Sequence, residues 1–327
     1  MRVLVTGAAG FIGTALCRRL EQEGFIVRRS VREGGETAPA SFHSSGPESI
    51  VLHDASGNDA IRAAMQGVDA VVHLAARVHV MRDTAADPLQ EFRRVNGFWT
   101  ERLLKAAAAE GVRRFVYMSS VKVNGERTTA PFTEADAPRP EDSYGVSKWE
   151  AEQIVTGVSA QTGIETVILR SPLVYGPGVG GNFLSLLKLI RRGIPLPLGS
   201  VTNKRSFIFL GNLADAVAAC VRDPRASGQT YLVSDGEDLS TPDLIRRFGR
   251  AMALPVRLWP VPVSLLRFLG HVVKRDDMVE RLTASLQLDA SKLRRELGWS
   301  PPWSVDRGIE ETAAWFMNRQ AAEPLGA

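Results

Sequence analysis

Short apolar runs alternate with helical patterns over the first two-thirds of the chain. The runs are rich in β-branched residues and nearly continuously apolar, which is typical of strands buried on both faces of a parallel sheet. Repeated β-α-β units of this kind predict an α/β fold with a doubly wound parallel sheet. The predicted strands are Val3–Val5, Ile26–Val31, Ile50–Leu52, Ala70–His73, Phe115–Met118 and Val167–Leu169. The helices predicted between them are Phe11–Glu23, Asn58–Met65, Leu89–Glu110 and Tyr144–Thr162.

The alternation of predicted strands and helices becomes less regular after Arg170, where loops interrupt it. We therefore expect a first domain over residues 1–171 and a smaller C-terminal α/β lobe over residues 172–327, part of which returns to the core of the first. This lobe would close over the carboxyl ends of the strands, where open α/β sheets bind ligands. The helices predicted in it are Phe183–Arg192, Asn212–Val221 and a helix that begins at an Asp289 N-cap and ends at Gly298.

The longest apolar stretch of the chain is Val261–Val273. It contains Arg267 and His271 and is too short to span a bilayer, so no membrane insertion is expected. Its apolar positions recur with helical spacing, which predicts a stripe buried against the body of the protein. The stripe consists of Leu265, Leu266, Leu269, Val272 and Val273.

The N-terminal strand leads into a glycine-rich turn and the start of a helix. Gly7 permits the turn, Gly10 lets the backbone approach a diphosphate, and Gly13 allows the helix to pack closely on the strand; Phe11 and Ile12 lie between them. The free N–H groups and the dipole of the helix N-terminus favour an anion. This segment predicts a Rossmann-type site for NAD(P), so residues 1–171 are expected to be the NAD(P)-binding domain.

The end of the second predicted strand bears on the choice between NAD and NADP. An NAD site usually carries an acidic residue there for the ribose 2′-hydroxyl. The chain instead has Arg28, Arg29 and Arg32, which could neutralise a 2′-phosphate and so favour NADP, although Glu33 could also take the acidic role. Asp54, after the third strand, is a candidate partner for the adenine amino group.

Catalytic side chains are predicted on the helix that begins at Tyr144. Tyr144 and Lys148 lie one turn apart on the same face, so the ammonium group could lower the tyrosine pKa and also reach the nicotinamide ribose. Ser119 and Ser120 follow a strand at its carboxyl end, where a hydroxyl could hold the reacting oxygen. Together these groups predict hydride transfer to or from a carbon that bears a hydroxyl or a ketone.

Composition excludes several other classes. The net charge of +4 comes from Lys and Arg residues interspersed with acids, which does not indicate nucleic-acid binding. Cys17 and Cys220 lie in apolar helical stretches and are expected to be buried thiols, and the five histidines lack zinc-ligand spacing, so no metal is expected. No secretory signal fits the N-terminus, and a cytoplasmic location is expected.

The chain resembles extended short-chain dehydrogenases/reductases of the NAD-dependent epimerase/dehydratase family, which act on nucleotide sugars. The likeness covers nearly the whole chain. It is carried by the glycine loop, His73-Leu74-Ala75-Ala76, Val95-Asn96-Gly97, Ser119-Ser120, the Tyr/Lys helix, Arg170 to Gly178, Asp289-Ala290-Ser291-Lys292 and Leu297-Gly298-Trp299.

The resemblance implies specific residue roles. Ser120, Tyr144 and Lys148 would be catalytic, and Asn96 would support the lysine through a proton relay. A UDP-sugar substrate would be held by Asn182, Arg205 and Arg281, and relatives suggest a homodimer formed through Leu89–Glu110 and Tyr144–Thr162. The cofactor would be lined by Leu74, Ala75 and Ala76 at the adenosine and ribose and by Pro172 and Leu173 at the nicotinamide.

The segment after Ser120 narrows the reaction. Family dehydratases carry an Asp-Glu pair there, whereas this chain has Lys122 and Asn124, so a 4,6-dehydratase is rejected. We favour a 4-keto reductase, in which NADPH reduces a UDP-4-keto-6-deoxy-hexosamine for surface polysaccharide, with Lys122 near the substrate. The alternative is a UDP-hexose or UDP-hexosamine 4-epimerase with tightly held NAD. A non-catalytic NADP-binding sensor or assembly factor is a remote third, because such proteins usually lose the Tyr/Lys pair.

Overall fold

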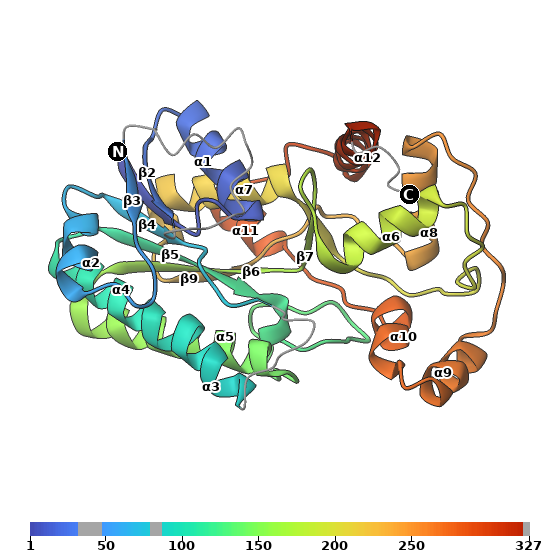
Figure 1. Ribbon diagram of the computed structural model, residues 1–327. Coiled ribbons are helices and arrows are strands. Elements are labelled where there is room, and N and C mark those ends of the chain that lie inside the picture. The colour runs from blue at the N-terminus through green and yellow to red at the C-terminus, as the bar shows by residue number, and fades with distance from the viewer. Residues whose placement is uncertain (32–47, 79–86, 323–327) are drawn as a thin grey trace.

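The computed structural model describes residues 1–31, 48–78 and 87–322 of the chain. Its centre is a seven-stranded sheet in which every neighbouring pair of strands runs parallel (Figure 1). The strands are β1 (Arg2–Thr6), β2 (Ile26–Val31), β3 (Ser49–Val51), β4 (Ala70–His73), β5 (Arg114–Ser120), β6 (Glu165–Ser171) and β9 (Gln229–Leu232). Their order is β3-β2-β1-β4-β5-β6-β9, which confirms the predicted doubly wound α/β fold.

Helices cover both faces of this sheet and bury one apolar core on each (Figure 1). On one face α1 (Phe11–Gln22) packs against α7 (Leu210–Arg222), with α11 (Ser291–Leu297) nearby. On the other face lie α2 (Asn58–Met65), α4 (Trp99–Ala109) and α5 (Ser143–Thr162). The chain after residue 172 returns to this body, since β9 pairs with β6 and α7 packs on α1.

The predicted helix Leu89–Glu110 is a composite of three segments. It comprises α3 (Pro88–Phe92), a π-helix over Arg93–Phe98 and α4, which follow one another without a break. The Asp87 side chain caps the first turn by accepting a hydrogen bond from the Gln90 backbone N–H. A π-helix widens the turn and re-aims the side chains that it carries, and such turns are frequent at functional sites.

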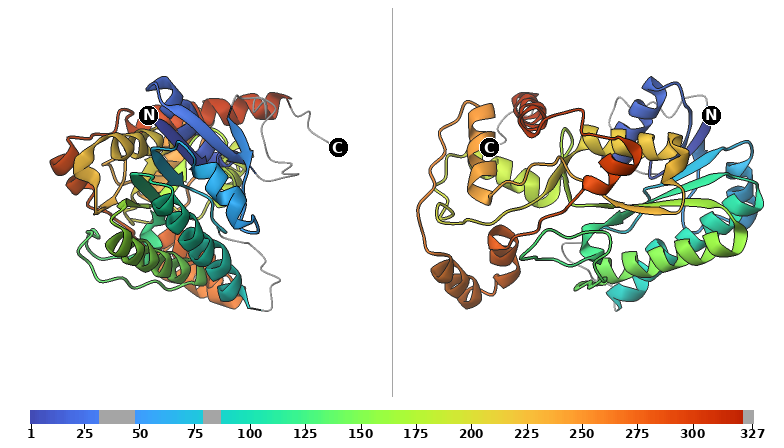
Figure 2. Two further views of the ribbon diagram at one scale, coloured as in Figure 1. Left: turned by 90° about the vertical axis from the view of Figure 1, so that its left-hand side faces the viewer. Right: turned by 180° about the vertical axis from the view of Figure 1, so that it is seen from behind.

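The remaining helices and strands form the end of the molecule that lies beyond the carboxyl edge of the sheet. A short parallel pair, β7 (Leu173–Tyr175) and β8 (Phe207–Phe209), leads into it. Its core contains the stacked rings of Tyr175 and Phe183, whose centroids lie 5.9 Å apart. Around this core gather α6 (Gly181–Arg191), α8 (Thr241–Ala251) and α12 (Val305–Ala322) (Figure 2). This end also contains α9 (Val263–Val272) and α10 (Asp276–Thr283), whereas the short helices η2 (Val121–Val123) and η3 (Pro224–Ala226) pack on the sheet body.

Two local expectations are wrong. The predicted helix at Asp289 begins at Ser291 instead: the Asp289 carboxylate accepts the Ser291 N–H two residues on, so it stabilises the approach to the helix rather than its first turn. The apolar stripe of α9 is exposed rather than buried. Of its members only Leu266 is buried, because only the face that includes Leu266 and Gly270 contacts the rest of the protein. Helical spacing alone does not specify whether a partner covers an apolar face.

Candidate active site

The predicted site residues meet at one edge of the sheet. The glycine turn follows β1, Leu74–Ala76 follow β4, Ser120 ends β5, and Pro172 follows β6. The register places these ends side by side, with Thr6 opposite His73, His73 opposite Tyr117, and Ser120 opposite Ser171. Because parallel strands present their carboxyl ends together, segments far apart in sequence converge on one crevice.

The glycine turn has no room for side chains. Gly7 has a φ of +70°, and a Cβ atom there would lie 2.9 Å from the Ala75 nitrogen. A Cβ atom on Gly13 would lie 2.1 Å from the Gly7 carbonyl oxygen. Gly7 therefore makes the turn and lets the loop after β4 approach it, while Gly13 brings α1 onto the turn, as expected for these two positions.

The N-terminus of α1 fits a diphosphate. Gly10 is the N-cap, no side chain caps the helix, and its first turn carries no acidic residue. The first N–H groups of α1 are therefore available to an anion, and the helix dipole favours one there. Phe11 lies 3.4 Å from the position that a Cβ of Gly178 would take, so the first residue of α1 borders the loop after β7.

The two arginines that suggested NADP are bound to groups of the protein itself. One guanidinium nitrogen of Arg28 donates to the carbonyls of Ala64 and Gln66 at 2.8 and 2.9 Å, and Arg29 is paired with Glu21 of α1. The expectation that this pair receives a 2′-phosphate is therefore not supported. Arg32 and Glu33 lie outside the described residues.

Asp54, the candidate for the adenine amino group, is paired with Arg94 of the π-helix. An adenine at this point would meet a carboxylate whose charge is already compensated. Asp54 therefore stays a proposed contact for adenine. The sequence did not single out Arg94, which lies beside it.

Ser120, Tyr144 and Lys148 lie together between β5 and α5. The hydroxyl groups of Tyr144 and Ser120 lie close together. Burial, reinforced by the nearby Asp142 carboxylate, raises the pKa of Tyr144 to about 12, and the Ser120 hydroxyl opposes this only in part. Tyr144 is thus a protonated phenol near neutral pH.

Lys148 does not approach the Tyr144 hydroxyl as expected. Its ammonium donates to the Met118 carbonyl at 2.7 Å and to the Tyr117 hydroxyl at 3.2 Å, both on β5. Burial lowers the pKa of Lys148 to about 7, against the opposing charge of Glu152. The Lys148 Nζ lies 6.0 Å from the centroid of the Tyr144 ring, and the expected lowering of the tyrosine pKa by this lysine is not seen.

Asn96 joins the catalytic helix to the loop after β4. Its side-chain amide donates to the Ser147 hydroxyl at 2.9 Å and to the Arg77 carbonyl at 3.1 Å, while its oxygen accepts the Arg77 N–H at 2.8 Å. The π-helix supplies this orientation, since Asn96 lies within it and is fully buried. Asn96 thus reaches the residue before Lys148, and a relay to the lysine stays a prediction.

Sequence reasoning missed a buried network behind the catalytic residues. Arg170 of β6 binds the carboxylate of Glu152, which also accepts the hydroxyl of Ser119, and Arg170 donates to Asn124 at 3.1 Å. The Asn124 amide in turn donates to the Thr133 carbonyl. The position of Glu152, one turn after Lys148 on the same helix face, was the available signal in the sequence.

His73 is a structural residue beside the site. It lies between the hydroxyls of Thr6 and Thr100, at 2.6 and 3.0 Å. Burial, with the charge of Lys148, lowers its pKa to about 3, so the ring is neutral.

The predicted substrate residues occupy varied positions. Half-buried Arg205 donates to the carbonyls of Arg281 and Ala284, at 3.0 and 3.2 Å, and burial lowers its pKa. Arg281 contacts Arg205 through its own backbone carbonyl, and the Arg281 side chain is exposed. Lys122 is paired with Glu126 and Asp142 at 2.9 and 2.5 Å.

The remaining predicted contacts are Asn182 of α6, Pro172 between β6 and β7, and Leu173 at the start of β7. Asn182 is exposed in the first turn of α6. Pro172 is buried and Leu173 is 49% exposed, as an apolar contact for a ligand would be.

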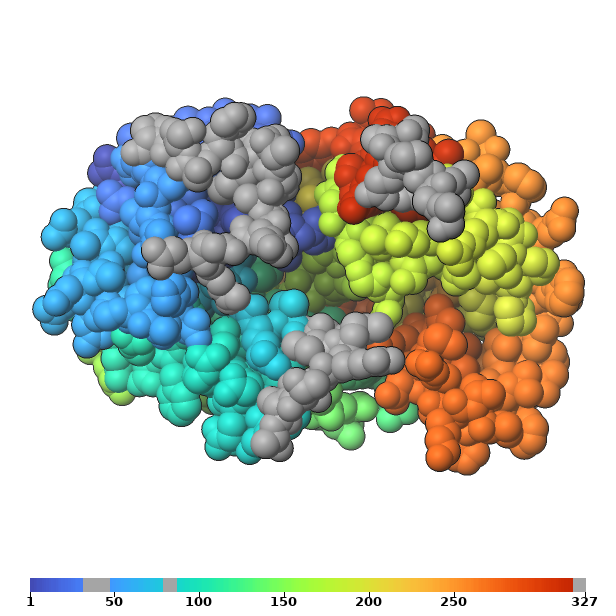
Figure 3. Space-filling view, viewed as in Figure 1, coloured from blue at the N-terminus to red at the C-terminus, as the bar shows by residue number. Residues whose placement is uncertain are grey.

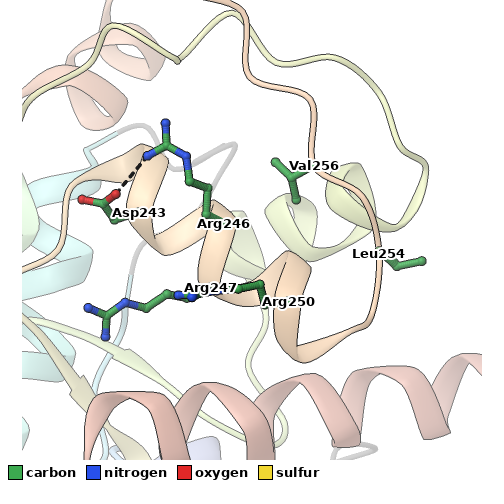
Figure 4. Close-up of a pocket in the computed structure, with 6 residues that line it drawn as sticks. All are labelled: Asp243, Arg246, Arg247, Arg250, Leu254 and Val256. Carbon is green, nitrogen blue, oxygen red and sulfur yellow. Dashed lines mark hydrogen bonds and ion pairs between the residues drawn. The ribbon is translucent and has the colours of Figure 1, made fainter.

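A separate cavity of about 490 Å³ lies on α8 and does not include these residues (Figure 4). Arg246 is paired with Asp243 at its edge, and Arg247 is paired with Glu237 and Asp306. The charges of two lining arginines are therefore already compensated. Among the described residues no three His, Cys, Asp or Glu side chains form a metal-binding group.

A model of the NAD dependent epimerase/dehydratase family matches residues 3–234. The chain belongs to this family. It is 40% identical over 319 residues to a UDP-glucose 4-epimerase of Vibrio cholerae, and the match covers 96% of this chain and 95% of that one. It is 27% identical over 324 residues to the N-acetyl-α-D-glucosaminyl-diphospho-ditrans,octacis-undecaprenol 4-epimerase of Escherichia coli O157:H7, covering 95% and 93%.

Solved structures of the same fold include UDP-glucuronic acid 4-epimerase from Bacillus cereus in complex with NAD. It superposes with a TM-score of 0.79 at 23% identity, covering 98% of this chain and 99% of that one. This epimerase/dehydratase family member is thus a short-chain-dehydrogenase-type enzyme of nucleotide sugars, as its residues implied. The glycine turn and the uncapped α1 fit the dinucleotide after which the family is named.

Proposed function

We propose that the protein reduces a 4-keto UDP-hexosamine, with Tyr144 as the proton donor. The observation that carries this proposal is the position of Tyr144: its hydroxyl lies beside that of Ser120, while the Lys148 amine donates to the Met118 carbonyl of β5, so the phenol holds the proton nearest to a ketone bound at Ser120. A reductase needs an acid at the ketone oxygen in its first step, whereas an enzyme that first oxidises an alcohol needs a base.

In the proposed step a hydride and a proton are added to the C4 ketone. A reduced nicotinamide held at the glycine turn would supply the hydride for C4 of the ketone and would leave oxidised. The Tyr144 hydroxyl gives its proton to the ketone oxygen, which Ser120 holds in position, and the product is a C4 alcohol. A proton from water then restores the Tyr144 phenol, and Lys148, whose pKa is about 7, lies nearby with its Nζ 6.0 Å from the centroid of the tyrosine ring.

We propose NADH as the reductant. The family is named for NAD, and the two arginines that favoured NADP are held by Glu21 and by backbone carbonyls. For the substrate diphosphate we propose Arg205, with Asn182 and Arg281 nearby, because a guanidinium group can bind two phosphate oxygens at once. The relative that acts on a diphospho-undecaprenol-linked sugar supports a product destined for surface polysaccharide.

A second candidate is a UDP-hexose or UDP-hexosamine 4-epimerase. It is favoured by the 40% identity to the Vibrio cholerae UDP-glucose 4-epimerase. In this reaction the ketone is an intermediate, the hydride returns to the opposite face, and the cofactor is regenerated in place.

One pair of measurements separates the two. The purified protein is denatured and any released nucleotide identified, and the native protein is then given a UDP-4-keto-6-deoxy-hexosamine with NADH or NADPH. The reductase predicts a protein free of tightly held nucleotide that consumes one reduced cofactor for each ketone. Stoichiometric NAD⁺ in the purified protein, with interconversion of C4 epimers and no net cofactor use, would overturn it.

We also propose that the enzyme is a homodimer formed through the α4 and α5 face. Support comes from Phe98, which is 57% exposed where the π-helix meets α4. Light scattering coupled to size-exclusion chromatography should give a dimer, and Phe98→Asp should dissociate it; a wild-type monomer would refute this proposal.

A further inference from the structure

Helix α9 presents three different faces. Leu266 and Gly270 face the protein, and Gly270 lets α10 approach, since a Cβ atom at this position would lie 2.6 Å from a methyl carbon of Val279. Arg267 and His271 lie one turn apart on a polar face. The third face is apolar and exposed. We call it the α9 stripe: Leu265, Phe268, Leu269, Val272 and, at the C-cap, Val273.

The α9 stripe is unusually exposed for side chains of this size. Leu265 and Leu269 are 46% and 48% exposed, and Phe268, Val272 and Val273 are 61–64% exposed. Scattered apolar residues on a surface need no explanation, but five on one face of a ten-residue helix form a contiguous patch, and such patches mark interaction sites. In Figure 3 the α9 and α10 segment forms a corner of the molecule, at the lower right.

The charges near the stripe are mixed, with a small basic excess. Residues 257–281 contain five Lys or Arg and three Asp or Glu. Glu280 is shared between Arg127 and Arg267, at 3.4 and 3.9 Å. Asp276 lies 3.4 Å from His271, and it begins α10, where an acidic residue suits the helix dipole.

Lys274 and Arg275 lie at the turn that follows the stripe, both exposed, and the exposed Asp276 and Asp277 come after them in the first turn of α10. The apolar face therefore ends in two cations. An apolar stripe bordered by Lys and Arg is the pattern of helices that lie in the interface of an anionic bilayer.

We propose that the α9 stripe docks this enzyme on an anionic lipid surface, with α9 in the plane of the interface and Lys274 and Arg275 at the headgroups. The size of the stripe favours this occupant over a second copy of the chain. A ten-residue helix is about 15 Å long and about 10 Å wide. Its footprint is therefore far below the roughly 800 Å² per partner of a stable protein interface, whereas a bilayer needs no complementary groove.

Docking through α9 would bring the substrate side of the enzyme to the membrane. Arg205 donates to the carbonyl of Arg281 at the end of α10, and the Asn203 amide donates to the carbonyls of Leu282 and Ala284. The segment that carries Arg205, the proposed diphosphate-binding residue, is thus hydrogen-bonded directly to α10, which packs against α9. The docking itself does not depend on which reaction the enzyme catalyses.

The test is sedimentation of the full-length protein with vesicles. One set is phosphatidylcholine alone, and the other contains about 30 mol% phosphatidylglycerol. We expect binding to the anionic vesicles that weakens severalfold in about 0.5 M NaCl. Phe268→Asp/Val272→Asp should lower binding at least about tenfold, because both side chains enter the apolar layer. Lys274→Ser/Arg275→Ser should lower it roughly fivefold per cation removed.

The matched control is Ile194→Asp, which places the same charge on a different exposed apolar residue, 43% exposed after α6. It should bind vesicles like wild type. A fluorescent label gives an independent readout: Cys17 and Cys220 are buried, so a polarity-sensitive thiol dye on Val272→Cys reports this position alone, and its emission should shift to the blue with anionic vesicles only.

Three results would overturn the proposal. They are no binding to anionic vesicles, equal binding by Phe268→Asp/Val272→Asp and wild type, or an unshifted label on bound protein. A self-association that Phe268→Asp/Val272→Asp abolishes, without vesicle binding, would assign the stripe to a second copy instead. Turnover of a soluble substrate by these variants verifies that they fold, because α9 contributes no residue to the proposed catalytic site.

Discussion

Arg170 and Glu152 form a buried, bidentate ion pair at the back of the active site. The distances are 2.6 Å from Nη2 to Oε2 and 3.0 Å from Nε to Oε1, and the two side chains are 5% and 2% exposed. The pair joins β6 to α5, the helix that carries Tyr144 and Lys148. Its geometry therefore fixes how the catalytic helix lies against the end of β5.

Breaking this pair should destabilise the protein strongly. Glu152→Leu leaves the Arg170 charge buried without a counter-charge, which should lower the free energy of unfolding by about 3–5 kcal/mol. Arg170→Met should have a similar effect. The double variant should recover much of the loss, because no unpaired charge remains. Urea denaturation of all four proteins measures the coupling, and additive losses would contradict it.

Tyr144→Phe should abolish most of the turnover while cofactor binding persists. The phenol proton is lost but the ring is kept, so we expect kcat to fall by ~10²–10⁴-fold. Ser120→Ala should reduce kcat by about 10²-fold through loss of one donor at the reacting oxygen. Binding of NADH, followed by its fluorescence, is the control. Near-normal turnover by Tyr144→Phe would remove this residue from the mechanism.

Lys148 should make stability depend on pH. Its pKa is lowered from 10.5 to about 7, so above pH 7 the unfolded chain binds a proton that the folded protein does not. Stability contributed by this group therefore rises with pH from about 7, at up to about 1.4 kcal/mol per unit. Lys148→Met removes the group. The difference in unfolding free energy between wild type and this variant, measured from pH 6 to 8.5 (roughly the window below thiol titration), should rise; a constant difference would refute the shift.

Gly13→Ala should prevent dinucleotide binding and destabilise the fold. The added methyl group would meet the Gly7 carbonyl 2.1 Å away, and both atoms belong to backbone that cannot give way without moving the turn. Gly157→Ala on α5 is the matched control, because a Cβ there meets nothing within 4 Å. It should stabilise the helix by about 1 kcal/mol. Calorimetric titration with NADH and thermal unfolding of both variants test the contrast.

The sequence by itself determined the first six strands, the glycine turn and the helix that carries Tyr144 and Lys148, but it did not predict β7, β8 and β9. These features depend on local properties: apolar runs, the space that Gly7 and Gly13 need, and the helical spacing of two residues. Strand ends that carry functional groups could be placed together because parallel strands end at one edge of the sheet. For the same reason the fold class was predictable without any knowledge of contacts.

Only the tertiary structure decided where individual charges and apolar faces point. Arg28 and Arg29 are compatible in sequence with a 2′-phosphate site, yet Ala64, Gln66 and Glu21 bind them, because residues far away in the chain fold beside β2. Lys148 donates its hydrogen bonds to β5 rather than to the Tyr144 hydroxyl for the same reason. The periodicity of α9 specifies an apolar face, but whether another element covers that face depends on the packing of the whole chain, and α9 keeps it exposed.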